Sequence, residues 1–215
     1  MGVNSQKSDE PLLIFFGAGG HARVAIEAAR AAGLKPDLVV DDKPVAAELL
    51  GVPVAAATSV KWQNWAGFRF VVTIGDNLTR AKLFEDLKGR GGKPETIVHP
   101  FSWISPSAKI GAGTVVFGGV VVNANSVIGE NCILNTGCSV DHDGKIGSHS
   151  HLCPGVHLAG IVTVGERTMM GTGSCCIPSI IIGSDALVGA GSVVVRNVPD
   201  KCKAMGNPAR VVSCD

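Results

Sequence analysis

A strict six-residue period runs through the second half of this chain. Every sixth residue from position 104 to position 194 is apolar, sixteen times in succession, in a chain that is 46% hydrophobic. The series consists of Ile104, Ile110, Val116, Val122, Ile128, Leu134, Val140, Ile146, Leu152, Leu158, Val164, Met170, Cys176, Ile182, Val188 and Val194. A period of six fits neither a helix nor a simple strand, and a fixed short period indicates stacked units that share a core.

Small residues lie four places after most of these apolar residues, and glycine directly follows many of them. Each hexad thus has one inward aliphatic residue, one small residue and a corner that tolerates glycine. This pattern predicts a coil with three sides. Three hexads make a turn of eighteen residues, so the sequence predicts a parallel β-helix of about five turns, in which each coil pairs with the next. The alternative is a β-solenoid with a purely structural role.

Length and charge limit the classes of partner. The 215 residues suffice for two modest domains, and a net charge of +1 with a pI near 7.6 indicates no cationic surface for nucleic acid or an anionic membrane. We therefore expect small-molecule partners. Residues 1–10 are polar and predict a flexible tail, and no apolar run has the length of a signal peptide or a membrane span.

The cysteines point to a reducing compartment. There are seven of them, without a C-x-x-C pair, and an odd number argues against a disulfide framework. Cys132 and Cys138 fall on small inward positions of the repeat, where we expect them to be buried as small hydrophobic residues. A cytoplasmic location is the simplest expectation.

A glycine-rich turn near the N-terminus predicts an anion site. Residues 11–16 are typical of a short buried strand, Gly17-Ala18-Gly19-Gly20-His21-Ala22 follows, and an alanine-rich helix extends to about Ala32. Free backbone N–H groups and the helix dipole then point to one place. Because this region has only three or four strands before residue 98, half of a full dinucleotide fold, we expect a mononucleotide site.

Polar residues follow the other strands predicted in this region. We expect strands at residues 37–40 and 68–74, a loop through residues 52–54, and a helix from Leu78 to about Lys88. Ligands bind at the carboxyl ends of strands in open α/β sheets. The polar residues at these ends are His21, Asp41, Asp42, Asp76 and Asn77. For each of them the alternative is a helix cap or a turn residue, and for Asn77, just before the helix, a cap and a ligand contact are equally expected. We expect Trp62 and Trp65 to form a small satellite core.

Four histidines crowd one part of the repeat, at positions 142, 149, 151 and 157. His142 stands between Asp141 and Asp143 at an exposed edge, and an imidazole beside carboxylates makes a base with a pKa near neutrality. Eighteen residues later comes Gly160, whose N–H could stabilise an oxyanion from the neighbouring coil. This pair suits acyl transfer. The alternatives are plain polar surface, or a metal site shared across a subunit boundary.

Several motifs together resemble one family. They are Gly17-Ala18-Gly19-Gly20-His21, Asp41-Asp42, Gly75-Asp76-Asn77, His99-Pro100, Asn135-Thr136-Gly137, Asp141-His142-Asp143 and Gly206-Asn207-Pro208-Ala209-Arg210. From about Leu12 to Val212 the chain resembles the sialic-acid O-acetyltransferase-like and bacillosamine-type sugar acetyltransferases of the hexapeptide-repeat superfamily. The resemblance implies a Rossmann-like α/β half-domain at residues 11–98, an all-β left-handed parallel β-helix at residues 99–196 and a C-terminal extension at residues 197–215. It also implies homotrimers with active sites between adjacent β-helices, and no metal.

The same resemblance implies an activity and a set of site residues. Acetyl-CoA would donate its acetyl group to the 4-amino group of a nucleotide-linked 4-amino-6-deoxy sugar. The implied catalytic residues are His142 as general base, Asp143 as its acidic neighbour, Gly160 as oxyanion amide, and Asn135. The implied acetyl-CoA-binding residues are His151, Gly160, Thr172, Gly173, Pro208 and Arg210. The implied nucleotide-sugar-binding residues are Gly17, Gly19, Gly20, His21, Asp41, Asp42, Asp76 and Asn77.

Two acceptors fit this resemblance best. GDP-perosamine is favoured because an aspartate, Asp143, follows the base, where the bacillosamine enzymes often have glutamate; a UDP-linked 4-amino sugar comes next. The other hypotheses are O-acetylation of a sialic acid and a non-catalytic sensor of sugar nucleotides. The intact His142, Asp143 and Gly160 argue against a sensor.

Overall fold

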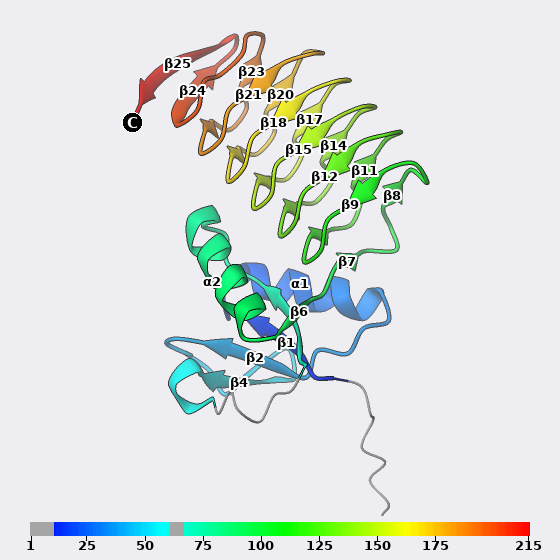
Figure 1. The fold of residues 1–215 in the computed structure, drawn as a ribbon, viewed down its shortest axis with the longest axis vertical. Helices are drawn as coiled ribbons and strands as arrows, with labels where there is room; N and C mark the ends of the chain where they lie inside the picture. The colour runs from blue at the N-terminus through cyan, green and yellow to red at the C-terminus, as the bar shows by residue number, and fades with distance from the viewer. Residues whose placement is uncertain (1–10, 61–66) are drawn as a thin grey trace, which may run out of the picture.

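The computed structural model describes residues 11–60 and 67–215, so Trp62 and Trp65 lie outside the described residues. An α/β domain forms one end of the molecule, and a β-helix rises from it with its C-terminal coils farthest away (Figure 1). This arrangement confirms the predicted fold class. In the described parts of the chain, no helix is long and apolar enough to cross a membrane.

The α/β domain contains a sheet with helices on both faces. Its elements are β1 (Leu13–Phe16), α1 (Gly20–Ala31), β2 (Leu38–Asp41), β3 (Glu48–Leu49), β4 (Val52–Ala56), the 3₁₀ turn η1 (Ala57–Ser59), β5 (Arg69–Val72), α2 (Asn77–Gly89) and β6 (Lys93–Pro94). The strand order is β3-β4-β2-β1-β5-β6, and all pairs are parallel except β3 with β4. Residues 52–54, expected to be a loop, belong to β4, because Val54 and its neighbours pair with β2.

Alternating residues of the central strands pack on different helices. Leu13 and Phe15 of β1 pack with α1, whereas Ile14 and Phe16 pack with Phe84 of α2. The cluster around α1 also contains residues of the β-helix, namely Ile97, Val115, Phe117 and Ile133. Helix α1 therefore lies between the sheet and the β-helix and packs on apolar residues of the first face, while the interior of the β-helix forms a separate core (Figure 1).

The β-helix has three faces built from two-residue strands. The first face consists of β7 (Ile97–Val98), β10 (Val115–Val116), β13 (Ile133–Leu134), β16 (His151–Leu152), β19 (Met169–Met170) and β22 (Leu187–Val188). The second consists of β8 (Trp103–Ile104), β11 (Val121–Val122), β14 (Ser139–Val140), β17 (His157–Leu158), β20 (Cys175–Cys176) and β23 (Val193–Val194). The third consists of β9 (Lys109–Ile110), β12 (Val127–Ile128), β15 (Lys145–Ile146), β18 (Thr163–Val164) and β21 (Ile181–Ile182). Parallel partners such as Val140 and Leu158 confirm the register of eighteen residues.

The hexad residues form the interior as predicted. Those from Val116 to Val194 are at most 5% exposed and make one continuous core, while Ile104 and Ile110 are half-buried at its first coil. The small positions have a second role, because their hydroxyl groups reach backbone carbonyls of the next coil. Ser126 Oγ donates to Asp141 O at 2.7 Å, and Ser150 Oγ donates to Gly165 O at 2.7 Å. These bonds satisfy buried polar groups within an apolar core.

Both predicted ends of the β-helix need correction. The first face already begins at Ile97, which pairs with Val115, so the solenoid starts before the expected boundary at residue 99. The C-terminal extension also continues the stack, because β24 (Cys202–Gly206) pairs in parallel with β22. Strand β25 (Ala209–Cys214) then folds back antiparallel on β24. The hexad pattern ends before these strands, but backbone pairing does not depend on it.

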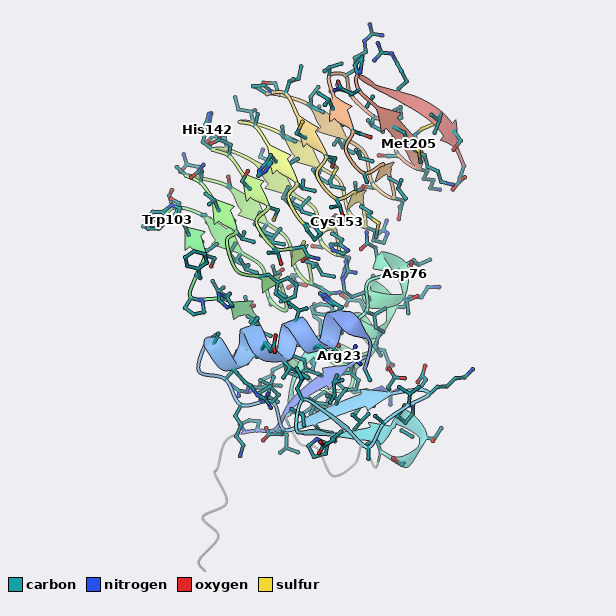
Figure 2. The ribbon with its side chains drawn as sticks, turned by 180° about the vertical axis from the view of Figure 1, so that it is seen from behind. Arg23, Asp76, Trp103, His142, Cys153 and Met205 are labelled. Carbon is teal, nitrogen blue, oxygen red and sulfur yellow. A yellow bond between two sulfur atoms is a disulfide. The ribbon has the colours of Figure 1, made fainter. Side chains whose placement is uncertain are left out.

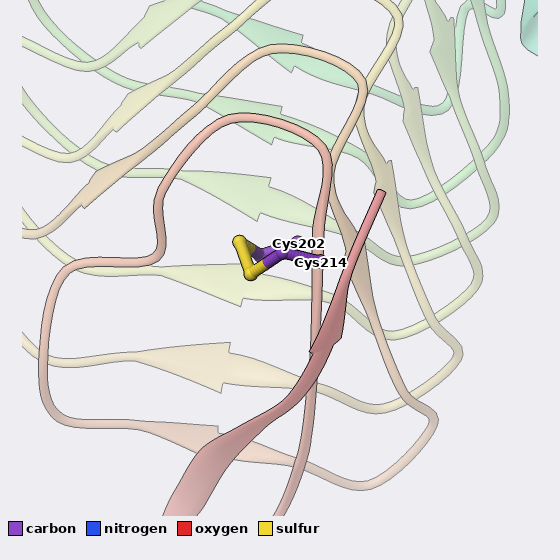
Figure 3. Close-up of a disulfide and its surroundings, with 2 residues drawn as sticks. All are labelled: Cys202 and Cys214. Atoms are coloured by element: carbon purple, nitrogen blue, oxygen red, sulfur yellow. A yellow bond between two sulfur atoms is a disulfide. The ribbon is translucent and has the colours of Figure 1, made fainter.

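A disulfide joins Cys202 to Cys214 across the antiparallel pair β24 and β25 (Figure 3). The odd cysteine count had argued against a disulfide framework, and for this pair the expectation was wrong. Directly opposed residues of two antiparallel strands have their β carbons close together, so a bond needs only a suitable register. The other cysteines are free, and Cys132 and Cys138 are buried as predicted.

Candidate functional site

His142 projects from the corner between the second and third faces, directly after β14. Its Nδ1 lies 2.8 Å from Asp143 Oδ2, and its backbone N–H donates to Asp141 Oδ1 at 2.8 Å. The hydrogen bond with Asp143 raises the pKa of the imidazole above its usual value. With Nδ1 engaged, Nε2 remains to accept a proton. We refer to Asp141, His142, Asp143 and Gly160 as the His142 corner.

Gly160 lies against the imidazole from the next coil. A β carbon built on Gly160 would be 2.5 Å from His142 Nε2, so only glycine leaves room for the ring there. In the other coils this corner position holds Pro106, Ala124 and Pro178, which shows that its backbone tolerates side chains. The Gly160 N–H has no hydrogen-bond partner within residues 11–60 and 67–215. A free amide beside a base is the arrangement predicted for an oxyanion donor.

The coil preceding His142 holds both of its acidic neighbours. Asn123 Nδ2 donates to Asp141 Oδ1 at 3.0 Å, and Asn125 Nδ2 donates to Asp143 Oδ1 at 3.4 Å. On the following coil Ile161 has a φ of 65°, in the left-handed region that a β-branched residue rarely adopts, and its side chain is 53% exposed. The corner therefore combines a hydrogen-bonded base with a strained apolar residue one coil above Asp143.

A second polar cluster lies where the first face meets the α/β domain. His151 projects from β16, its Nε2 is 3.2 Å from Asn135 Nδ2, and its ring centroid is 6.4 Å from that of His21. Burial, and next the charge of Arg80, lower the pKa of His21 to about 4 and that of His151 to about 3. His21 Nε2 and His151 Nδ1 are buried, and no described residue hydrogen-bonds to either nitrogen. We refer to His21, Asn135 and His151 as the junction.

The glycine turn beside the junction is open at the start of α1. Gly19 is the N-cap residue and makes no side-chain cap, and no acidic residue stands in the first turn. The first N–H groups of the helix are therefore available to an anion. Asp41 organises this turn, because its Oδ2 accepts from the Ala18 N–H at 2.7 Å and its Oδ1 accepts from the Lys43 N–H at 2.9 Å.

A pocket of about 250 Å³ opens at the carboxyl ends of the central strands. Its lining consists of Phe16, Gly17, Val40, Asp41, Asp42, Ala57, Ile74, Leu83 and Asp86. Asp42 is exposed, and within the described residues no hydrogen bond engages its carboxylate. The pocket thus offers carboxylates and an apolar wall, without a cationic side chain among these residues.

Asp76 and Asn77 have structural partners in the free protein. Asp76 is the N-cap of α2 and accepts from the Thr79 N–H at 2.8 Å, and this bonding lowers the pKa of its carboxyl group. Asn77 is 7% exposed; its Oδ1 accepts from Arg80 Nη2 at 2.7 Å and its Nδ2 donates to Arg167 O at 2.9 Å. The cap alternative is therefore correct for Asp76, whereas Asn77 is the first residue of the helix and not its cap.

Arg80 is a residue that the sequence analysis missed. It is 0% exposed and bonds to both domains. Its spacing from Phe84 and Leu87 was a usable signal, because residues i, i+4 and i+7 share one face of a helix and this face is apolar. A charged residue on the buried side of α2 needs a special environment.

Four of the residues implied for acetyl-CoA lie on later coils of the β-helix and on its terminal hairpin. Thr172 and Gly173 are exposed at the corner between the first and second faces. Pro208, which follows a cis peptide bond, and Arg210 belong to the terminal hairpin of β24 and β25. Figure 2 shows Met205 of this hairpin at the end of the molecule away from Arg23 of the α/β domain.

The His142 corner and the junction do not meet within one chain. Asn135 and His142 occupy the two corners that bound β14, so they are separated by the width of the second face, on the order of 15 Å. In Figure 2 His142 lies at the edge of the β-helix, away from Asp76 and Cys153. Across the described ranges, no group of three or more His, Cys, Asp or Glu side chains could hold a metal ion.

Comparisons with known proteins find relatives of both parts of this chain. Residues 12–87 match the PglD N-terminal domain family. GDP-perosamine N-acetyltransferase of Escherichia coli O157:H7 is 30% identical over 206 residues, which is 91% of this chain and 93% of that protein. A Saccharomyces cerevisiae protein provisionally named as an acetyltransferase is 40% identical over 58 residues, and the chain matches only 30% of its length.

Two solved structures extend the likeness to the whole architecture. Caulobacter crescentus PerB, solved in complex with CoA and GDP-perosamine, is 42% identical with a TM-score of 0.88, over 94% of this chain and 97% of that one. The acetyltransferase domain of PglB from Neisseria gonorrhoeae, in complex with acetyl coenzyme A, is 35% identical with a TM-score of 0.86, over 94% of this chain and 99% of that one.

Proposed function

Because this chain belongs to the PglD- and PerB-like family of hexapeptide-repeat N-acetyltransferases, we propose that it acetylates the 4-amino group of a nucleotide-linked 4-amino-6-deoxy sugar. Acetyl-CoA is the donor, and GDP-perosamine is the favoured acceptor. The observation that carries the proposal is the imidazole of His142 seated between Asp143 and Gly160, on a fold whose 42% identical relative was solved with CoA and GDP-perosamine. The five cysteines that stay free beside the single disulfide support a cytoplasmic location, which we also propose.

The chemistry is a direct transfer at the His142 corner. The sugar nitrogen attacks the thioester carbonyl while His142 Nε2 accepts a proton from that nitrogen, and Asp143 stabilises the imidazolium that forms. The Gly160 N–H donates to the oxyanion of the tetrahedral intermediate. When the intermediate collapses, the carbon–sulfur bond breaks and the proton passes to the leaving thiolate, which gives CoA and the amide. Holding both substrates in one groove removes the need for an acyl-enzyme.

A complete active site requires a second copy of the chain. The glycine turn beside the junction offers free N–H groups and the His142 corner holds the base, but the second face separates the two within one protomer. We propose a homotrimer in which the His142 corner of one subunit meets the junction of its neighbour. Near the first coil, Trp103 is 58% exposed and Phe101 is 78% exposed in the single chain. A neighbouring subunit that covers these two side chains would remove their apolar surface from water.

The strand-end pocket favours guanine over uracil. Its lining includes Asp41, Asp42 and Asp86, and the carboxylate of Asp42 is free in the described structure. Guanine presents an N1–H and an amino group side by side, which together suit one carboxylate, whereas uracil presents a single N–H between two carbonyl acceptors. This supports a GDP-linked acceptor.

Thiol release from acetyl-CoA tests the proposal. We expect release with GDP-perosamine, slower release with a UDP-linked 4-amino sugar and none with a sialic acid. Release with the sialic acid alone would establish O-acetylation, and silence with all three acceptors would favour a sensor. His142→Asn should lower the rate by roughly 10²–10⁴, the usual loss with a general base. Near-full turnover of this variant at every pH would exclude the mechanism.

A further inference from the structure

Arg80 is a buried cation without an anionic partner. Its side chain is 0% exposed, and no carboxylate of the described residues forms an ion pair with it. Burial lowers the pKa of its guanidinium to about 10, so the group still carries its charge at neutral pH. A buried charge is unfavourable unless something compensates it.

Neutral oxygens of both domains surround this guanidinium. In the α/β domain it donates to Ile74 O at 3.0 Å, Gly75 O at 3.1 Å and Asn77 Oδ1 at 2.7 Å. In the β-helix it donates to Asn131 O at 3.1 Å and His149 O at 2.6 Å. These bonds join the loop after β5 to one corner of the solenoid in two successive coils. They satisfy the N–H groups, but carbonyl dipoles leave the net positive charge in place.

The positive charge of Arg80 acts on the junction. It is the second cause, after burial, of the low pKa of both His21 and His151. The other titratable groups nearby are Asp76 and Cys132, which act on Arg80 itself, and His149, whose pKa burial and Arg80 also lower. Two neutral histidines with unpaired ring nitrogens thus stand beside an uncapped helix N-terminus and a buried cation on which the Asp76 carboxylate acts without forming an ion pair.

We propose that Arg80 is a positioning residue that sets the angle between the two domains and supplies the charge that the diphosphate of the bound nucleotide balances. The diphosphate would lie at the start of α1, with His21 and His151 as neutral hydrogen-bond donors. This rests on the proposed function for the identity of the ligand as a nucleotide sugar. The charge itself is present in the free protein.

The test compares Arg80→Met, Arg80→Lys and a control, Arg30→Met, which removes a charge from the exposed side of α1. Calorimetric titration with GDP and, separately, with acetyl-CoA gives both affinities. A unit charge about 7–10 Å from an anion at an effective dielectric constant of about 20 corresponds to roughly 15- to 50-fold in affinity. We expect this loss for GDP in Arg80→Met, partial recovery in Arg80→Lys, and a smaller loss for acetyl-CoA, whose implied contacts include His151.

Two results would overturn the proposal. Wild-type affinity for GDP in Arg80→Met would show that the charge does not act on the nucleotide, and an equal loss for both ligands would show a structural clamp only. Absence of GDP binding to the wild type would overturn it too. The proposed function is tested separately, by turnover of GDP-perosamine by the wild type.

A measurement on the wild type covers the case in which Arg80→Met does not fold. Titration of the histidine resonances by NMR should show two side chains that stay neutral to below about pH 5, against an ordinary pKa near 6.5. GDP should raise the pKa of both, because a nearby anion favours the protonated form. If all histidines titrate normally, or GDP shifts neither of these two, Arg80 does not have the proposed role.

Discussion

Replacement of Gly160 by alanine tests the geometry of the His142 corner most directly. The new β carbon would lie 2.5 Å from His142 Nε2 and 2.6 Å from Cε1. Carbon and nitrogen atoms in ordinary contact are about 3.5 Å apart, so the ring must retreat by roughly 1 Å. This displacement breaks the alignment between Nε2, the attacking nitrogen and the thioester. A misplacement of about 1 Å can cost on the order of 10²-fold in rate.

The same substitution should leave folding intact. Gly160 is not among the residues with positive φ, and Pro106, Ala124 and Pro178 occupy the equivalent position in other coils. The clash involves only the end of an exposed side chain, which can move into solvent. Alanine also restricts the unfolded chain, which stabilises a compatible site by about 0.4–1 kcal/mol. We therefore expect unchanged or slightly higher melting temperature together with a loss of about 10²-fold in kcat/KM.

Thiol release and thermal denaturation measure the two effects. Gly89→Ala at the end of α2, where a β carbon meets nothing within 4 Å, controls for the general effect of glycine replacement. In a His142→Asn background, Gly160→Ala should cost less than about threefold, because residues that act as one unit are not additive. If Gly160→Ala alone keeps activity within about threefold of the wild type at every pH, the ring does not work in the position seen here.

Three further outcomes follow from the described contacts. Asp143→Asn replaces the carboxylate that raises the pKa of His142 with a neutral amide, so the rising limb of the pH profile of kcat/KM should move to lower pH while the maximal rate falls; an unmoved limb would separate Asp143 from the base. Ile161→Asn places a residue that tolerates left-handed backbone at a φ of 65°, and denaturant titration should show a gain of about 1 kcal/mol; a loss of stability would mean that no strain is stored there. The pKa of His21 is lowered to about 4 and that of His151 to about 3. Below about pH 6.5 the unfolded chain therefore binds more protons than the native state. The free energy of unfolding should fall by about 3 kcal/mol per histidine between pH 6.5 and pH 4. Constant stability over this range, measured by urea titration, would show that these histidines are not held neutral.

Part of the candidate site was accessible from the sequence. The register of eighteen residues follows from the hexad period, so the position of Gly160 one coil above His142 could be predicted before any coordinates existed, and the pairing of Val140 with Leu158 confirms it. The glycine turn before an uncapped helix could also be predicted, because a strand, glycines and a helix follow one another along the chain. The roles of these residues in catalysis remain predictions.

Other features depend on contacts between distant residues. Asp41 lies at a strand end as expected, yet its two oxygens are engaged by the Ala18 and Lys43 N–H groups, which no sequence pattern announces. The disulfide of Cys202 depends on a strand pair beyond the last hexad. Arg80 could be recognised only as an oddity on an apolar helix face.

The amino-acid sequence by itself determined the coil, its period and the position of Gly160 one coil above His142, because each depends on residues at a constant separation that repeat the same side-chain requirement. Tertiary structure alone decided how the α/β domain sits on the first face, and therefore that His21 meets His151 while His142 lies on another corner. The contacts responsible join residues 69 and 90 positions apart, Arg80 with His149 and Asn77 with Arg167. Such contacts depend on how the surface of the α/β domain fits the surface of the β-helix. The hexad pattern lies within the β-helix alone and does not specify that fit.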